Sequence, residues 1–183
     1  MEPGPDDALW QAIAAHRIGP DDASLSFEQR LARENGWSAD YAGRVVLEYK
    51  KFCYLACTAG HQVTPSDQVD QAWHLHLTYT RDYWERFCPQ VLHRPLHHGP
   101  TAGGPAEKAR YFQQYAQTLA AYEQTFGALP PEDIWSPASE RFGSHLSGVR
   151  VHTDHVVTLS RRTLWLALGG AIVLSLAIGL VMG

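Results

Sequence analysis

The chain has 183 residues, a formal net charge of −4 and 45% hydrophobic residues, which suits one folded domain of moderate size. Without Arg161 and Arg162, the residues before a C-terminal apolar run carry 13 Lys plus Arg against 19 Asp plus Glu, a net charge of −6. This acidic balance argues against nucleic acid as a partner. The three cysteines give no disulfide framework, which is typical of a reducing compartment, and we expect them to pack.

Capping and breaking residues divide the first 60 residues into three predicted helices. The first covers about 6–18 and stops at a Gly-Pro pair. The second covers about 26–35 and begins with a capping box, in which the Ser26 hydroxyl caps and Gln29 returns the bond. The third covers about 38–59, with a serine cap and a glycine after its end.

A fourth helix is predicted from Thr64 to Phe87, with Thr64 as the cap and Pro65 in the first helical position. A helical wheel of this segment places Leu75 and Asp82 on its more exposed side. The segment also carries the densest histidine signal of the chain, because six of the ten histidines fall between residues 61 and 98.

The order Asp70-x-x-Trp73-His74-x-His76 predicts a shared ligand face on this helix. Asp70 and His74 are four residues apart and stack about 40° from each other, the spacing by which a helix offers two ligands to one ion. His76 lies about 160° around the helix from His74, so it cannot share that ion on a regular helix.

A Gly- and Pro-rich loop follows from His93 to Pro105, and it is held by packing, by ligands or not at all. In a metal interpretation, Asp70 and His74 supply two ligands, His97 or His98 supplies one or two more, and water completes a tetrahedral Zn²⁺-like site. An open position would permit hydrolysis by a metal-bound hydroxide, but the sequence contains no HExxH motif and no obvious catalytic base.

A structural interpretation of the same residues stays open. Asp70 then orients His74 or His76 by a hydrogen bond, and the imidazoles satisfy backbone groups of the loop. Buried polar networks of this kind specify a fold without any chemistry. The predicted structural cluster consists of Trp73, His76 and Cys88.

The rest of the chain up to residue 160 is predicted to hold one more helix. It covers about 106–126 and closes at a glycine. Residues 128–142 form a predicted extended arm that docks one tryptophan back on the bundle, and 143–160 form a polar juxtamembrane linker.

The segment from Leu164 to Met182 is predicted to be a transmembrane helix. Its nineteen residues carry no charge and span about 28 Å as a helix, close to the hydrocarbon thickness of a bilayer. Arg161 and Arg162 precede it directly, which predicts a cytosolic N-terminal domain. The start of the chain has no signal peptide, so we expect insertion after translation, as in a tail-anchored protein.

Small residues recur every four positions along this segment and form a stripe that permits close helix approach. The stripe predicts a homodimer through the membrane, although spanning helices are rich in Gly and Ala in any case. Its members are Ala167, Ala171, Ser175 and Gly179, followed by Gly183.

The run SDQVDQAWHLHLTYTRDYW, with the Phe-Cys-Pro and HRPLHH segments after it, resembles the glycine-rich domain-containing protein-like family of plants and bacteria. The resemblance covers about residues 38–135 and implies a helical domain without an established activity. The glycine-rich region that names the family is absent. The family pattern falls on Asp70, Trp73, His74, His76, Cys88 and His98, with His97 adjacent.

These observations predict an all-α protein, with a soluble domain of about five helices over residues 1–142, the linker, and a transmembrane anchor over 161–183. We expect an interaction or scaffolding module with a structural Asp/His centre on the cytosolic face of a membrane, and a protein as its partner. The alternative is a membrane-tethered, zinc-type hydrolase. The residues decide neither an enzymatic activity nor whether zinc binds.

Overall fold

The computed structural model describes residues 7–20, 22–99 and 103–143, together with residues 162, 163, 165, 166 and 169. The chain separates into two units, Met1–His145 and Leu146–Gly183, and each helix named below belongs to the first. Every element of regular structure in the described ranges is helical, which confirms the predicted all-α class.

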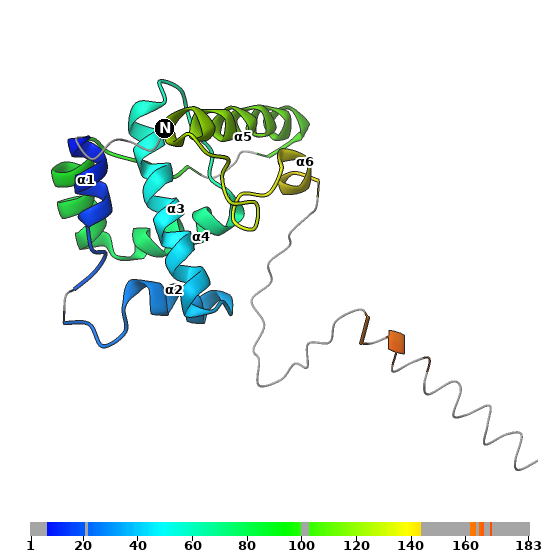
Figure 1. The fold of residues 1–183 in the computed structure, drawn as a ribbon, viewed down its shortest axis with the longest axis horizontal. Coiled ribbons are helices and arrows are strands. Elements are labelled where there is room, and N and C mark those ends of the chain that lie inside the picture. Colours follow the sequence, from blue (N-terminus) through cyan, green and yellow to red (C-terminus); the bar gives the residue numbers. More distant parts are fainter. Residues whose placement is uncertain are drawn as a thin grey trace, which may run out of the picture. The chain divides into compact units, whose positions relative to one another are not determined.

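The described residues of that first unit form seven helices, where the sequence predicts about five. They are α1 (Ala8–Ala15), α2 (Phe27–Asn35), α3 (Ala39–Thr58), α4 (Asp67–Thr78), the π-helix η1 (Asp82–Leu92), α5 (Pro105–Phe126) and α6 (Ala138–Arg141). Helix α3 contacts α1, α2, α4 and α5, and Figure 1 shows it in cyan through the middle of this unit, with α5 across one end. The core is therefore built around α3, which buries Tyr49, Phe52, Cys53 and Leu55.

The predicted caps of α2 and α3 are confirmed. The Ser26 hydroxyl accepts a hydrogen bond from the Gln29 amide at 3.2 Å, and the Gln29 side chain accepts one from the Ser26 amide at 2.9 Å. Gly36 ends α2 with a left-handed φ of 68°. The Ser38 hydroxyl caps α3 by accepting from the Tyr41 amide at 3.1 Å. Local hydrogen-bonding chemistry thus sets these boundaries.

The prediction of one continuous helix from Thr64 to Phe87 is wrong. Helix α4 begins after Ser66, whose hydroxyl accepts from the Val69 amide at 3.2 Å, so Ser66 and not Thr64 is the cap. The helix ends at Thr78, because Tyr79 takes φ −84° and ψ 57°, outside the helical region. The chain then starts again as η1, which turns the following side chains in a new direction.

The wider turns of η1 accommodate a proline. In an α-helix the Pro89 ring would clash with the carbonyl of residue 85 and leave that carbonyl without its donor. Here the Glu85 carbonyl accepts from the side-chain amide of Gln90 at 2.7 Å, and Pro89 lies inside the π-helix. A π-helical segment of this kind often occurs at a functional site.

The break after α4 also corrects the predicted exposed side of this segment. Asp82 is 6% exposed and Leu75 is 7% exposed, although a single helical wheel places both toward solvent. Gln71, Thr78 and Glu85, on the same predicted side, are exposed as predicted, so the prediction is wrong only for Leu75 and Asp82. Asp82 belongs to η1, and its direction does not follow from the periodicity of α4.

The Asp7 carboxylate holds the start of α1 against α3. It accepts from the Trp10 amide at 2.9 Å and from the Tyr54 hydroxyl at 2.5 Å. The Tyr54 bond and then the Trp10 bond lower the pKa of Asp7, whereas burial, followed by the bond to Asp7, raises the pKa of Tyr54 to about 12. Since the folded pKa of Asp7 is below its unfolded value, Asp7 contributes stability above the unfolded pKa, and this is lost as the pH falls through the folded pKa.

We expect Tyr54→Phe to raise the pKa of Asp7 toward its ordinary value, because the variant removes the strongest donor to the carboxylate. The titration of the carboxyl carbon, followed by NMR, measures this shift. Asp133 is the internal control, because Arg44 lowers its pKa independently of Tyr54. An unchanged Asp7 titration would contradict the assignment.

The predicted docking of a tryptophan from the arm after α5 is confirmed. Trp135 is 2% exposed, and its indole Nε1 donates to Glu48 Oε2 on α3 at 2.9 Å. The arm contains turns, with the Trp135 amide bonded to the Pro131 carbonyl at 2.8 Å, and it continues into α6, which the sequence analysis does not predict. Arg44 on α3 also forms two hydrogen bonds to the Asp133 carboxylate, each 2.8 Å long.

Within the described part of the chain, no helix has the length and apolar character that crossing a membrane requires. The predicted anchor lies almost wholly outside the described residues, which include only Trp165, Leu166 and Gly169 of its apolar run. The small-residue stripe and the linker over 144–160 also lie outside them.

Candidate functional site

One group of potential metal ligands lies partly exposed on α4. Asp70 and His74 come from consecutive turns of this helix, and His98 comes from the segment that follows η1. The His98 Nε2 atom lies 2.8 Å from Asp70 Oδ1 and 3.0 Å from His74 Nε2, and His74 Nε2 lies 3.7 Å from Asp70 Oδ2. The side chains of Asp70, His74 and His98 are 20%, 51% and 22% exposed, so solvent reaches the group.

The position of His98 Nε2 is unusual for a hydrogen-bonding group. An imidazole nitrogen has one in-plane site, which holds either a proton or a lone pair. His98 Nε2 nevertheless faces a carboxylate oxygen and a second imidazole nitrogen at hydrogen-bonding distance. One proton satisfies only one of these contacts, whereas one cation between the three atoms satisfies all of them.

Tyr83 holds the segment that carries His98. Its hydroxyl accepts from the indole Nε1 of Trp73 at 2.8 Å and donates to the Leu96 carbonyl at 2.5 Å. The rings of Trp73 and His98 are in edge-to-face contact, with centroids 4.5 Å apart. Tyr83 is fully buried, and its burial raises its pKa, which keeps the hydroxyl a donor. Side chains of α4 and η1 thereby fix a segment that has no regular structure.

We expect Tyr83→Phe to lower the free energy of unfolding by about 2 kcal/mol, because it leaves the buried Trp73 Nε1 without an acceptor and the Leu96 carbonyl without its donor. Urea denaturation measures the loss. Hydrogen exchange should also accelerate at the amides of residues 96–98, with the amides of α3 as the internal control. Unchanged exchange at residues 96–98 would contradict the role of Tyr83.

The structure brings together three of the four predicted metal ligands. His97 is not among them, because its ring packs on Trp84, with centroids 5.4 Å apart. Trp84 is 42% exposed, so this pair lies at the surface. Neighbouring histidines of the HRPLHH segment therefore have different surroundings.

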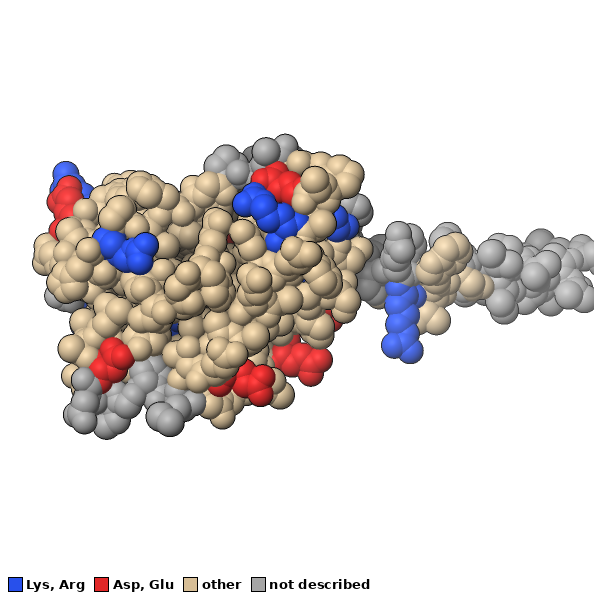
Figure 2. Space-filling model, turned by 90° about the horizontal axis from the view of Figure 1, so that it is seen from above, with Lys and Arg blue, Asp and Glu red and all other residues tan. Residues whose placement is uncertain are grey.

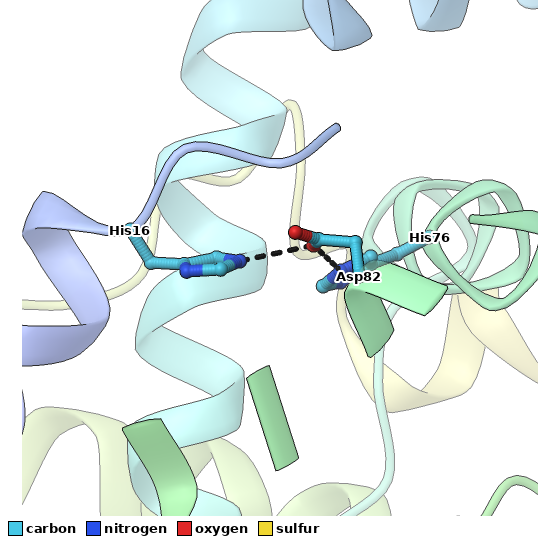
Figure 3. A group of neighbouring side chains, drawn as sticks. All are labelled: His16, His76 and Asp82. Carbon is cyan, nitrogen blue, oxygen red and sulfur yellow. Dashed lines mark hydrogen bonds and ion pairs between the residues drawn. The ribbon is translucent and has the colours of Figure 1, made fainter. Parts of the chain in front are cut away.

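A second group of imidazoles and a carboxylate is buried on the other side of α4. His76 Nε2 lies 2.8 Å from Asp82 Oδ2, and His16 Nε2 lies 3.0 Å from the same oxygen. Figure 3 shows the Asp82 carboxylate between the two rings, with His16 entering from the chain after α1. His76 is 0% exposed, Asp82 6% and His16 9%. The group joins the N-terminal segment to α4 and η1.

One hydrogen bond and one ion pair extend this buried group in two directions. Tyr49 Oη lies 2.9 Å from His76 Nδ1, and Arg86 Nη1 lies 3.1 Å from Asp82 Oδ1. Burial lowers the pKa of His76, and the bond to Asp82 offsets this only in part. Burial acts to raise the pKa of Asp82, but the hydrogen bonds from His76 and His16 outweigh it and lower the pKa.

The buried group was missed in the sequence because two of its members gave no local signal. His16 is 66 positions from Asp82 and lies outside the histidine-rich stretch. The helical wheel places Asp82 on the exposed side of a helix that ends before it, at Thr78. Of the predicted structural cluster, Trp73 is 6% exposed and Cys88 is 3% exposed, and only His76 belongs to the buried group.

The cysteines have the character of packing residues. Cys53 and Cys88 are buried, Cys57 is half-buried, and all three are free thiols. Burial raises the pKa of each thiol, which disfavours the thiolate needed for nucleophilic attack or metal binding.

The comparisons with known proteins match residues 24–116 to the UCP032817-like family, which is uncharacterized. The chain belongs to this family. No curated protein and no solved structure matches it. The partly exposed group lies wholly inside the UCP032817-like region, whereas His16 of the buried group precedes it. The matching family is not named for a glycine-rich domain, so the match does not show the resemblance to the glycine-rich domain-containing protein-like family.

Proposed function

We propose that this protein is a membrane-tethered interaction module whose helical domain binds a Zn²⁺-type cation at Asp70, His74 and His98. We call these three residues the surface centre. The observation that carries the proposal is the position of His98 Nε2, which faces both Asp70 Oδ1 and His74 Nε2. A shared cation is the simplest arrangement that satisfies all three ligand atoms.

The distances in the surface centre support this proposal. Zinc lies about 2.0–2.1 Å from imidazole nitrogen and carboxylate oxygen, so tetrahedral ligand atoms are about 3.3 Å apart. The distances of 2.8, 3.0 and 3.7 Å lie on both sides of that value. Two imidazoles and one carboxylate suit zinc and neighbouring transition metals better than Mg²⁺ or Ca²⁺, which prefer oxygen ligands alone.

In the proposed module, the cation fastens the segment after η1 to α4 and so shapes a surface for a protein partner. Trp84 is a large aromatic residue that is 42% exposed, and its ring packs on His97, the residue next to His98. On the face in Figure 2, charged side chains of the helical unit form small groups between larger uncharged areas. Depletion of charge together with exposed aromatic residues is typical of the centre of protein interfaces.

The membrane part of the proposal rests on the sequence. The uncharged run of residues 164–182 has the length of a membrane span, and Arg161 and Arg162 place the helical domain on the cytosolic side. The small-residue stripe supports pairing of two copies in the bilayer. We also propose, from the resemblance over about residues 38–135, a relationship to the glycine-rich domain-containing protein-like family.

One observation favours the alternative, a membrane-tethered zinc hydrolase. The surface centre has three protein ligands, and the His74 side chain is 51% exposed, so a fourth position remains open to water. Zinc sites with three protein ligands and a bound water are typical of catalysis. Zinc-dependent turnover of ester or phosphoester substrates would favour this alternative over the module.

The test is zinc affinity of the full chain in detergent micelles, measured by competition with a chelating dye. We expect His98→Ala to weaken zinc binding at the surface centre by at least about 100-fold, since loss of even an outer-shell partner costs 10–100-fold. His97→Ala is the matched control, because the neighbouring imidazole packs on Trp84, and we expect wild-type affinity for it. Equal affinities for the two variants would contradict the proposed site.

A further inference from the structure

The buried group places two imidazoles on one carboxylate oxygen in a manner that suits a cation. Both Nε2 atoms approach Asp82 Oδ2, whereas Asp82 Oδ1 is buried without a hydrogen bond and has only the Arg86 ion pair. A network held by hydrogen bonds alone would gain from using both oxygens, because an unsatisfied buried acceptor costs free energy. One ligand atom from each of His16, His76 and Asp82 lies within 4.8 Å of the other two, which is close enough for all three to bind one cation.

The surroundings of His76 support metal ligation. Its Nδ1 atom lies 2.9 Å from Tyr49 Oη, so Tyr49 can accept from Nδ1–H of His76 when Nε2 binds a cation. In that tautomer the Nε2 lone pair is the ligand, whereas without a cation Nε2–H donates to Asp82. Metal-binding histidines are oriented in the same way, by a hydrogen bond from the other ring nitrogen.

We propose that His16, His76 and Asp82 form a second cation site, which takes one Zn²⁺-type ion in the interior of the helical domain. Two imidazole nitrogens and one carboxylate oxygen give it the same donor chemistry as the surface centre. The two sites share no residue, and His74 and His76 point to nearly opposite sides of α4. The buried ion joins the chain after α1 to α4 and η1, and the Arg86 guanidinium stays on the other carboxylate oxygen.

The experiment is metal stoichiometry of the full chain in micelles, with Zn²⁺ added and bound metal measured by mass spectrometry after gel filtration. We expect two ions per wild-type chain and one for His16→Gln. Asp70→Asn removes the surface ion and also leaves one. His61→Gln changes an exposed histidine outside both groups and keeps two.

A second measurement on the wild-type chain does not depend on any variant folding. After addition of a chelating dye, we expect release in two phases, with the buried ion about tenfold or more slower, since its exit requires local opening of the domain. His16→Gln should remove the slow phase and Asp70→Asn the fast phase.

The outcomes separate the two sites. One ion per wild-type chain that Asp70→Asn removes and His16→Gln leaves in place would overturn the buried site and keep the surface centre. One ion that His16→Gln removes and Asp70→Asn leaves would support the buried site and contradict the surface centre. Two ions in His16→Gln, with the slow phase intact, would overturn the buried site.

Discussion

Replacement of Trp135 by alanine is expected to lower the free energy of unfolding by about 4 kcal/mol, because it empties a buried volume and removes the contact that docks the arm after α5. Trp135 is 2% exposed, and its ring centroid lies 5.9 Å from that of Tyr122 and 6.2 Å from that of Tyr115. The variant also leaves Glu48, which is 4% exposed, without the indole donor.

Urea denaturation of the full chain in micelles measures this effect, with two comparisons. Trp135→Phe keeps much of the ring but loses the bond to Glu48, so we expect a loss of about 2 kcal/mol. Trp84→Ala, at a tryptophan that is 42% exposed, should change stability by less than about 1 kcal/mol. A Trp135→Ala variant as stable as Trp84→Ala would show that the arm does not contribute to the fold.

Asp82→Ala is expected to lower the free energy of unfolding by about 3 kcal/mol in the presence of a chelator, before any bound cation adds to the difference. The carboxylate is 6% exposed and is the common partner of His16 and His76. Its removal leaves the ring nitrogens of His16 and His76 without their acceptor, and each buried unsatisfied group costs about 1–3 kcal/mol.

Arg86→Ala is the matched control for Asp82→Ala. Arg86 contacts the other oxygen of the same carboxylate, but its side chain is 52% exposed. Because the Arg86 side chain is about half exposed, its removal lets water reach Asp82 Oδ1, so a smaller loss of about 1 kcal/mol is expected. Chemical denaturation with chelator present compares the variants. Equal losses for Asp82→Ala and Arg86→Ala would mean that the histidine contacts of Asp82 contribute little.

Local signals in the sequence were sufficient to predict much of the helical fold. The serine caps at Ser26 and Ser38 act within four residues of the chain, so their hydrogen bonds can be read directly from the sequence. The break at Tyr79 has no such signal, because no glycine or proline lies there. The proline of this region, Pro89, lies ten positions later and is accommodated by a π-helix instead of ending the helix.

The candidate site also has a part that the sequence predicts and a part that it does not. Asp70 and His74 could be paired because helical geometry relates residues four apart. The choice between His97 and His98 could not be made, because it depends on how Tyr83 and Trp73 hold an irregular segment. His16 reaches Asp82 only through tertiary packing across 66 positions, which periodicity does not reveal.

The most direct measurement of the surface centre is the NMR shift of the imidazole nitrogens during zinc titration of the full chain in micelles. His16→Gln is used so that only the surface centre is loaded. We predict that the Nε2 resonances of His74 and His98 move together and saturate at one equivalent, while those of His97 stay in place. Movement of His97 in place of His98, or no saturable movement of either, would contradict a cation site at Asp70, His74 and His98.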